Sequence, residues 1–195
     1  VYHSLGYRAA PPAPIAAYAP SRRVLSLGSF SKILAPGLRL GWIQTSAPLM
    51  RPFVESGLVD SGGGLNPFTS ALVRTALEAG WQDDFLAGLI QTYGERSATL
   101  GKAIEVELGE LADFTLPAGG FFFWLRLRGA AATLDADQLL KVARAHHVGF
   151  QPGKRFSSQG GLSHAIRLSF AFYDTAGLVE GARRLAGAIN AAVVR

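Results

Sequence analysis

Apolar residues along the chain follow two alternating patterns, and each pattern predicts a different kind of element. Two short β-rich runs, Val24–Leu27 and Leu40–Ile43, are separated by a turn. Further on, apolar residues recur at intervals of three, four or seven residues, in one stripe over residues 72–77 and a longer one over residues 86–104. Gly80 separates these stripes, which predict two helices, and Asp83 or Asp84 is expected to cap the second.

The remainder of the chain alternates strand-like and helix-like segments. Strand patterns occupy Phe121–Leu127, Val148–Phe150 and Ile166–Phe170. Asp135 with Gln138 resembles a capping box ahead of one helix, and Asp174 can cap the last one. One face of that last helix is apolar, with Leu178, Ala182, Leu185 and Ile189. These segments predict a small α+β sandwich.

Pro, Gly and Ser residues indicate the structure expected for three further segments. Ser46 and Pro48 form a helix start, with an apolar face that continues to Gly57. Residues 9–20 are rich in Pro and Ala, so they predict a surface loop without regular helix, or alternatively a flexible linker. The Gly-rich residues 61–67 predict a flexible connection, or alternatively a loop that covers a substrate.

Composition narrows the class of protein. With 195 residues and 49% apolar content, the chain can form one or two domains with a packed core. It has no cysteine, no apolar run near the ~18 residues of a membrane span, and no charged-then-apolar leader. The net charge of +5 is scattered, which is a weak indication of nucleic-acid binding. We therefore expect a cytoplasmic protein without a membrane segment.

Reactive side chains gather in one otherwise apolar stretch, Ser29–Trp42. Lys32 lies in a Ser-x-Ser-Lys turn, and apolar surroundings disfavour the charged form of an amine, which makes it a nucleophile toward carbonyls. Arg39 follows seven residues later and is expected to open the second strand. If the two strands pair, these groups and the two serine hydroxyls suit a phosphate. The alternative is a solvated Lys32 and an Arg39 in a surface ion pair.

The longer string, Ser29–Lys32 followed by Ala35–Trp42, resembles the pyridoxal-phosphate attachment segment of class I/II aminotransferases of fold type I. It looks most like the aminoadipate and kynurenine aminotransferases and the aminotransferase-like domains of MocR-type regulators. The resemblance implies that Lys32 carries pyridoxal 5′-phosphate. Ser29, Ser31 and Arg39 would hold the phosphate of this cofactor, and Tyr2 matches the tyrosine that hydrogen-bonds its phenolic oxygen.

Two motifs in the second half also resemble this family. Residues 117–124 fit a strand motif, and residues 148–156 followed by Ile166–Phe170 fit the signature of the small domain. The resemblance implies that Arg167 binds the α-carboxylate of the substrate. From the residues alone, an arginine in a strand is more often the exposed member of an alternating pattern.

The resemblance covers nearly the whole chain and implies an α/β fold. Residues 1–90 would be the C-terminal part of the large, cofactor-binding domain, and residues 91–195 the small α+β domain. The aspartate that pairs with the pyridine nitrogen would precede Val1 by two residues. We therefore interpret the chain as the C-terminal half of an aminotransferase that moves amino groups between amino acids and 2-oxo acids, as a homodimer. Alone, this fragment is expected to be inactive or nearly so.

Other interpretations remain open. The chain could be the effector-binding domain of a MocR/GntR-type regulator, which would bind DNA if a helix-turn-helix precedes it. It could also be a remnant that keeps the motifs but binds no cofactor. His146 and His147 are adjacent at a predicted helix end, where a positive charge is favoured, and we expect no metal site there.

Overall fold

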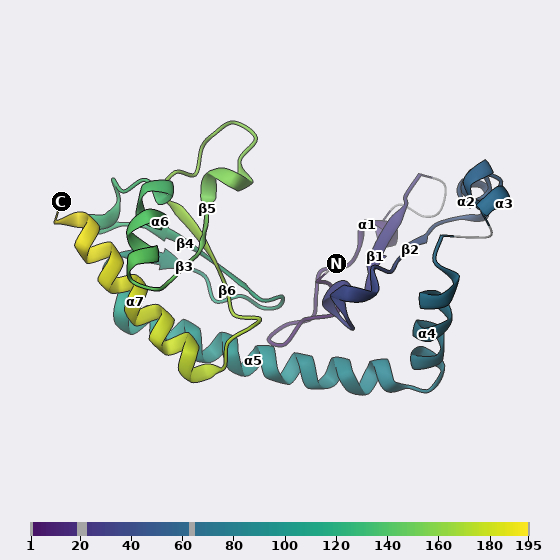
Figure 1. Ribbon diagram of the computed structural model, residues 1–195, viewed down its shortest axis with the longest axis horizontal. Coiled ribbons are helices and arrows are strands. Elements are labelled where there is room, and N and C mark those ends of the chain that lie inside the picture. Colours follow the sequence, from purple (N-terminus) through teal and green to yellow (C-terminus); the bar gives the residue numbers. More distant parts are fainter. Residues whose placement is uncertain (1, 19–22, 63–64, 195) are drawn as a thin grey trace. The chain divides into compact units, whose positions relative to one another are not determined.

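The computed structural model describes residues 2–18, 23–62 and 65–194. The chain divides into two compact units, Val1–Ile90 and Gln91–Arg195, and Figure 1 shows the elements of each.

The first unit contains a two-stranded antiparallel hairpin. Strand β1 (Ser26–Ser29) pairs with β2 (Gly41–Gln44), and Leu27 lies opposite Ile43. The connection contains two 3-10 turns, η1 (Phe30–Lys32) and η2 (Pro36–Leu38). The pairing of the two β-rich runs is thus confirmed.

Two glycines allow the strands of this hairpin to approach closely. A Cβ atom on Gly28 would lie 1.9 Å from Cε2 of Trp42 and so overlap with the indole ring. On the opposite strand, a Cβ on Gly41 would lie 2.7 Å from the Gly28 carbonyl oxygen. Side chains at these positions are therefore excluded by the packing of β1 against β2.

Helices follow this hairpin along the chain. Helix α2 (Ala47–Val54) follows Ser46 with Pro48 in its first turn, which confirms the predicted start. Helix α4 (Pro67–Glu78) ends before Gly80, which has a φ of +75°. Helix α5 (Trp81–Leu108) then begins at once, so Asp83 and Asp84 lie inside its first turn, and the prediction that either caps it was wrong.

Two predicted loops contain short helices. Helix α1 (Ile15–Tyr18) forms directly after Pro14, whose carbonyl accepts the first helical N–H, from Ala17. The expectation of no helix in residues 9–20 was therefore wrong for this segment, and Ala19 and Pro20 lie outside the described residues. Helix α3 (Gly57–Gly62) includes the start of the predicted Gly-rich loop, of which Gly63 and Gly64 also lie outside the described residues.

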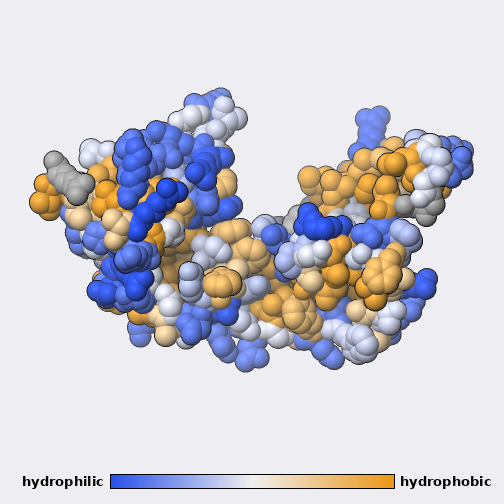
Figure 2. Space-filling model, viewed as in Figure 1, coloured by the Kyte–Doolittle hydropathy of each residue, from blue (hydrophilic) through white to orange (hydrophobic). Residues whose placement is uncertain are grey.

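Exposed apolar side chains occur on both faces of the β1–β2 hairpin. Leu27 and Ile43, paired on one face, are 70% and 40% exposed, and Trp42 on the other face is 42% exposed. Figure 2 shows apolar surface over this unit. Strands that are apolar on both faces are typical of the interior of a larger sheet, and a lone two-stranded hairpin is marginally stable. The hairpin is therefore consistent with part of a larger α/β sheet.

The second unit is an antiparallel sheet with helices. The strand order is β3-β4-β6-β5, with β3 (Ala112–Phe114), β4 (Phe122–Leu127), β5 (Gln151–Pro152) and β6 (Ala165–Ser169). Helix α6 (Ala136–Ala145) and the short turns η3 (Gly129–Ala131) and η4 (Gly153–Phe156) connect the strands, and α7 (Thr175–Val193) follows them. Asp135 and Asp174 cap α6 and α7 as predicted.

The strand expected at Val148–Phe150 was misplaced, because backbone N–H groups in and just before this segment bind carbonyl groups at the end of α6. His147 adopts a φ of +56°, and its N–H binds the Arg144 carbonyl at 3.1 Å. The Val148 N–H binds the Ala143 carbonyl, also at 3.1 Å. These amides close the helix, so strand pairing begins only at Gln151.

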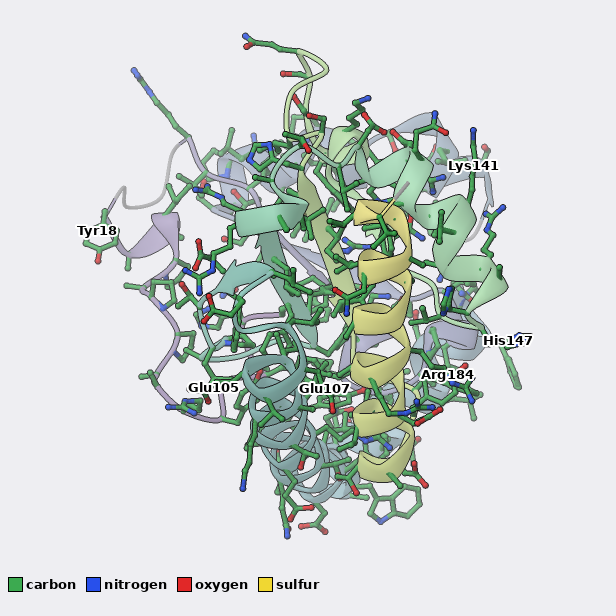
Figure 3. All side chains as sticks on the ribbon, turned by 90° about the vertical axis from the view of Figure 1, so that its left-hand side faces the viewer. Tyr18, Glu105, Glu107, Lys141, His147 and Arg184 are labelled. Atoms are coloured by element: carbon green, nitrogen blue, oxygen red, sulfur yellow. The ribbon has the colours of Figure 1, made fainter. Side chains whose placement is uncertain are left out.

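The two faces of this sheet differ. One face forms the core, with Phe123, Leu125, Leu127, Ile166 and Leu168 buried. The opposite face carries Phe122, Trp124, Arg167 and Ser169, which are partly or fully exposed. Figures 1 and 3 show α7 beside the C-terminal part of α5. Within the described ranges, no helix has the length and apolar character to cross a membrane.

Candidate cofactor and substrate site

The turn that carries Lys32 is fixed by its own hydrogen bonds. Strand β1 ends at Ser29, whose hydroxyl oxygen accepts the N–H of Ser31 at 3.2 Å and so caps η1. The N–H groups of Ile33, Leu34 and Ala35 all bind the Phe30 carbonyl, Leu34 at 2.8 Å. Lys32 is the last residue of this 3-10 turn and is partly buried. The backbone on both sides of the lysine is therefore held in one conformation.

The turn packs against apolar neighbours, as its sequence predicts. The rings of Phe30 and Trp42 lie 4.7 Å apart between centroids, and Ile33 is only 8% exposed. The Phe30 N–H also binds the Leu40 carbonyl at 3.1 Å, which ties η1 to the residue before β2. Lys32 thus follows a backbone segment that is anchored on both strands.

A glutamine that sequence reasoning missed also holds this turn. The side-chain amide of Gln82 donates from Nε2 to the Ile33 carbonyl at 2.7 Å, and Gln82 is only 5% exposed. Its Oε1 atom is buried and has no hydrogen-bond partner among the described residues. A polar residue in the first turn of a helix ordinarily faces solvent, so no sequence signal distinguished Gln82 from the neighbouring Asp83.

Arg39 lies in strained backbone rather than in a strand. It follows η2 with φ 51° and ψ 39°, and β2 starts only at Gly41, so the prediction that Arg39 opens the strand was wrong. Its Nη1 donates to the Pro36 carbonyl at 3.0 Å, which orients the exposed guanidinium. A left-handed conformation costs a non-glycine residue roughly 1–2 kcal/mol, and such strain concentrates at ligand sites.

Tyr2 lies in a turn near the start of the chain. The Leu5 N–H binds the Tyr2 carbonyl at 3.0 Å, and the fully buried Leu5 anchors this turn in the first unit. The Tyr2 side chain is 38% exposed. Tyr2, Ser29, Ser31, Lys32 and Arg39 all belong to this unit, whereas Arg167 belongs to the second.

The stretch of sequence that carries the first-unit residues is positively charged. Residues 1–54 contain six of the chain's Lys and Arg residues and none of its Asp or Glu residues. The turn itself supplies two hydroxyls, an amine and a guanidinium with five N–H donors. With no acidic side chain in this stretch of sequence, the donor set fits the phosphate of pyridoxal 5′-phosphate.

Arg167 is held between aromatic rings on the open face of the second unit's sheet. Its guanidinium carbon lies 4.0 Å from the centre of the Phe122 ring and 4.4 Å from that of Phe156. The Nε atom is buried without a hydrogen-bond partner in the described part of the chain. The side chain lines a cavity of about 380 Å³. These two ring contacts restrict the guanidinium, and a planar guanidinium can bind a carboxylate through its edge.

A second cavity, of about 330 Å³, lies beside α7 and shares Gly149, Ser169 and Tyr173 with the first. Figure 3 shows His147 and Arg184 on one side of this unit, where Arg184 Nη1 donates to the His147 carbonyl at 3.3 Å. Hydrogen bonds from Arg183 and Arg184 lower the pKa of Glu180 to about 2. These charges are satisfied locally, so we assign them a structural role.

Residues 1–185 match the family described as aminotransferase class I and II. The chain belongs to this family. It is 32% identical over 190 residues to aromatic-amino-acid aminotransferase 1 of Thermococcus litoralis, a match that covers 97% of this chain and 44% of the relative. It also resembles a transcriptional regulator of the HTH type, YisV of Bacillus subtilis, with 26% identity over 95% of this chain and 37% of the relative.

Solved structures agree with this assignment. LysN, an α-aminoadipate aminotransferase of Thermus thermophilus crystallised with N-(5′-phosphopyridoxyl)-L-leucine, superimposes with a TM-score of 0.86 at 29% identity. The match covers 100% of this chain and 49% of LysN. The chain therefore spans about half the length of these relatives. The family resemblance and the α/β fold inferred from the sequence motifs are confirmed, whereas the roles of the individual site residues stay predictions.

Proposed function

We propose that this chain is the half of a pyridoxal 5′-phosphate-dependent aminotransferase that carries the attachment lysine and the substrate-carboxylate arginine. The reaction would move an amino group between an amino acid and a 2-oxo acid. One observation carries the proposal: the 3-10 turn that ends at Lys32 is fixed by Ser29, Gln82 and the Phe30 carbonyl. It lies in a stretch of sequence without acidic residues, in a chain of the aminotransferase family.

Each predicted residue has a role that its surroundings support. Ser29, Ser31 and Arg39 would bind the phosphate, Arg39 from a side chain oriented by Pro36. Tyr2 would donate to the phenolic oxygen of the cofactor. Arg167, stacked on Phe122, would bind the substrate α-carboxylate through the edge of its guanidinium.

The chemistry of the proposed reaction divides between cofactor and protein. Pyridoxal 5′-phosphate, when bound, supplies the electron sink for a carbanion. Lys32 would hold the cofactor through Nζ, and after release of that amine the same atom would take the proton from the substrate α-carbon. A turn with a fixed backbone would keep Nζ within reach of this proton.

An assay of amino-group transfer tests this proposal. The 195-residue chain alone, supplied with cofactor, amino acid and 2-oxo acid, is expected to show little or no turnover. Combined with the part of the family's fold that this chain does not span, it should transfer the amino group, and Lys32→Arg should remove that activity while keeping the positive charge. Turnover that survives Lys32→Arg would contradict the assignment of Lys32, and turnover by the isolated chain would contradict the need for a second half.

A second candidate function is effector binding in a transcriptional regulator. The likeness to the HTH-type regulator YisV favours it. In that protein class, the same Lys32, Arg39 and Arg167 would bind cofactor and effector without turnover. The coding sequence upstream of Val1 decides between the two: a basic helix-turn-helix indicates a regulator, and the first half of an aminotransferase fold indicates an enzyme. In either case we expect a homodimer, which the molar mass from light scattering would test.

A further inference from the structure

Arg96 of α5 binds the backbone that follows β6. Its Nη1 atom donates to the Ala171 carbonyl at 2.6 Å, and the side chain is partly buried. In the described part of the chain, none of the ion pairs includes Arg96. A charged donor strengthens a hydrogen bond, so a guanidinium without an acidic partner makes this carbonyl contact a firm anchor for Ala171.

Tyr93 lies one turn before Arg96 on the same face of α5 and supports the end of β6. Its ring packs on Phe121 and on the fully buried Phe170, with centroids 5.6 Å and 6.3 Å apart. The Phe170 N–H in turn binds the Phe121 carbonyl at 3.1 Å. One face of α5 therefore fixes residue 170 by ring packing and residue 171 by a hydrogen bond.

The backbone of residues 171–173 has little support apart from Arg96. It joins the end of β6 to Asp174, which caps α7. The Ala171 N–H reaches the Ser169 hydroxyl only at 3.4 Å, near the limit for a hydrogen bond. Among the described residues, the backbone groups of residues 172 and 173 make no hydrogen bond. Arg96 is thus the main polar anchor of this segment.

Phe172 and Tyr173 form one wall of the cavity that contains Arg167. Their ring centroids lie 5.2 Å apart, yet the two residues are 84% and 60% exposed. A Cβ on Gly177 would lie 3.3 Å from Cβ of Tyr173, so α7 leaves space for this residue on one side. Exposed rings bury little apolar surface, so the position of the wall depends on the backbone that carries it.

We propose that Arg96 is a positioning residue for the candidate substrate site, and that it acts through Ala171 to hold Phe172 and Tyr173 at the cavity that contains Arg167. A wall that is already fixed does not have to be ordered when a carboxylate binds, which favours binding. The role in substrate binding rests on the function proposed above. The contact itself lies entirely within the second unit.

Nuclear magnetic relaxation of the backbone amides of the 195-residue chain measures this role without a ligand. In the parent, we expect order parameters of about 0.85 for residues 171–173, typical of rigid backbone. Arg96→Met removes the donor but keeps an apolar stem, and should lower these values below about 0.6 while α7 stays rigid. Arg96→Lys keeps the charge and a donor, and should restore part of the order. Lys102→Met removes an exposed charge from the same helix and is the matched control, which should change nothing.

Calorimetric titration with valerate, a simple carboxylate, links the segment to the cavity. Arg96→Met should weaken valerate binding by about threefold or more, and Arg96→Lys should weaken it less. In a chain that already carries Phe172→Ala and Tyr173→Ala, Arg96→Met should have no further effect, because the wall that it positions is gone. A general loss of folding would instead weaken binding with and without the two rings.

Unchanged order parameters in Arg96→Met would overturn the proposal. An equal loss of valerate affinity with and without the two rings would also overturn it, because the charge of Arg96 would then act on the ligand directly. If the methionine variant does not fold, Arg96→Lys is used for both comparisons. Absence of valerate binding to the parent would contradict the role of Arg167 in the proposed function, whereas the relaxation measurement would still decide the role of Arg96.

Discussion

The indole ring of Trp42 occupies the space where a side chain on Gly28 would begin. Gly28 and Trp42 are directly paired across β1 and β2, and a Cβ on Gly28 would lie 1.9 Å from Cε2 of the ring. On the same strand pair, Trp42 also packs on Phe30, the first residue of the turn that ends at Lys32. Because Trp42 packs on both Gly28 and Phe30, this packing determines how the turn that carries Lys32 leaves the hairpin.

Gly28→Ala is expected to destabilise the chain by about 1–3 kcal/mol, because the indole ring is rigid and neighbouring backbone must shift. Urea unfolding followed by circular dichroism measures this change. Gly37→Ala is the matched control, since a Cβ there meets nothing within 4 Å and the variant should unfold like the parent. In a chain that already carries Trp42→Ala, Gly28→Ala should cause little further loss in the free energy of unfolding. An equal loss with and without Trp42 would contradict the assigned clash.

Arg39→Gly should separate stability from cofactor binding. Glycine adopts the φ of 51° without strain, so the free energy of unfolding should stay unchanged or rise by about 1 kcal/mol. Binding of pyridoxal 5′-phosphate should nevertheless weaken, because the guanidinium is lost. Arg39→Lys keeps the charge but not the planar fork of donors, and should give intermediate affinity in a fluorescence titration. Unchanged affinity in Arg39→Gly would show that Arg39 does not hold the phosphate.

Gln82→Leu tests whether the glutamine positions the lysine turn. The substitution leaves the buried Ile33 carbonyl without its donor, and an unsatisfied buried carbonyl costs about 1–3 kcal/mol. Reductive attachment of the cofactor to Lys32 should fall as well, because the turn that carries the lysine loses this support. Asp83→Ala, at the exposed neighbouring position, serves as the control. If Gln82→Leu matched this control in both measurements, the positioning role would be wrong.

Asp135 should make the second unit sensitive to acid. The hydrogen bond from Lys154 lowers the pKa of Asp135, partial burial opposes this effect, and the N–H groups of Gln138 and Asp137 lower the pKa further. A carboxyl with a lowered pKa in the folded state stabilises the protein above its unfolded pKa of ~3.9, and that contribution is lost as the pH falls through the folded value.

Comparison of two substitutions isolates the charge of Asp135. Asn caps helices nearly as well as Asp, so Asp135→Asn should remove part of the loss of stability below about pH 4, with little change in capping. Asp135→Ala should additionally cost about 1 kcal/mol at neutral pH. Urea unfolding at neutral pH and at about pH 3, below the unfolded pKa, measures both. The same acid-dependent loss in Asp135→Asn and the parent would mean that other carboxyls control it.

The sequence predicted most elements whose signals are local. The caps Asp135 and Asp174, the start at Ser46 and the pairing of two short strands depend on residues within a few positions, and these predictions are confirmed. Two predictions were wrong because a backbone contact in the folded chain outweighed the local sequence pattern. The amides of His147 and Val148 close α6 instead of entering a strand, and Arg39 takes a left-handed turn before β2.

The residues of the candidate site could be named from the sequence, but the contacts that hold them in place could not. Lys32 and Arg167 could be named because they sit in longer family motifs. Gln82 could not, since its partner Ile33 lies 49 residues away and no periodic pattern connects them. The stacking of Arg167 between Phe122 and Phe156 likewise depends on β4, β6 and η4 meeting in space. Contacts between segments that are far apart in the sequence can be identified only once the fold is known.

Reductive trapping of the cofactor on the purified 195-residue chain tests whether Lys32 lies in a formed cofactor site. The chain is incubated with pyridoxal 5′-phosphate, reduced with borohydride and digested, and the modified lysine is identified by peptide mass. We expect one dominant adduct on Lys32, which disappears in Lys32→Ala and weakens in Arg39→Gly. Adducts spread over surface lysines such as Lys102 and Lys141, with no preference for Lys32, would contradict a formed cofactor site in this chain.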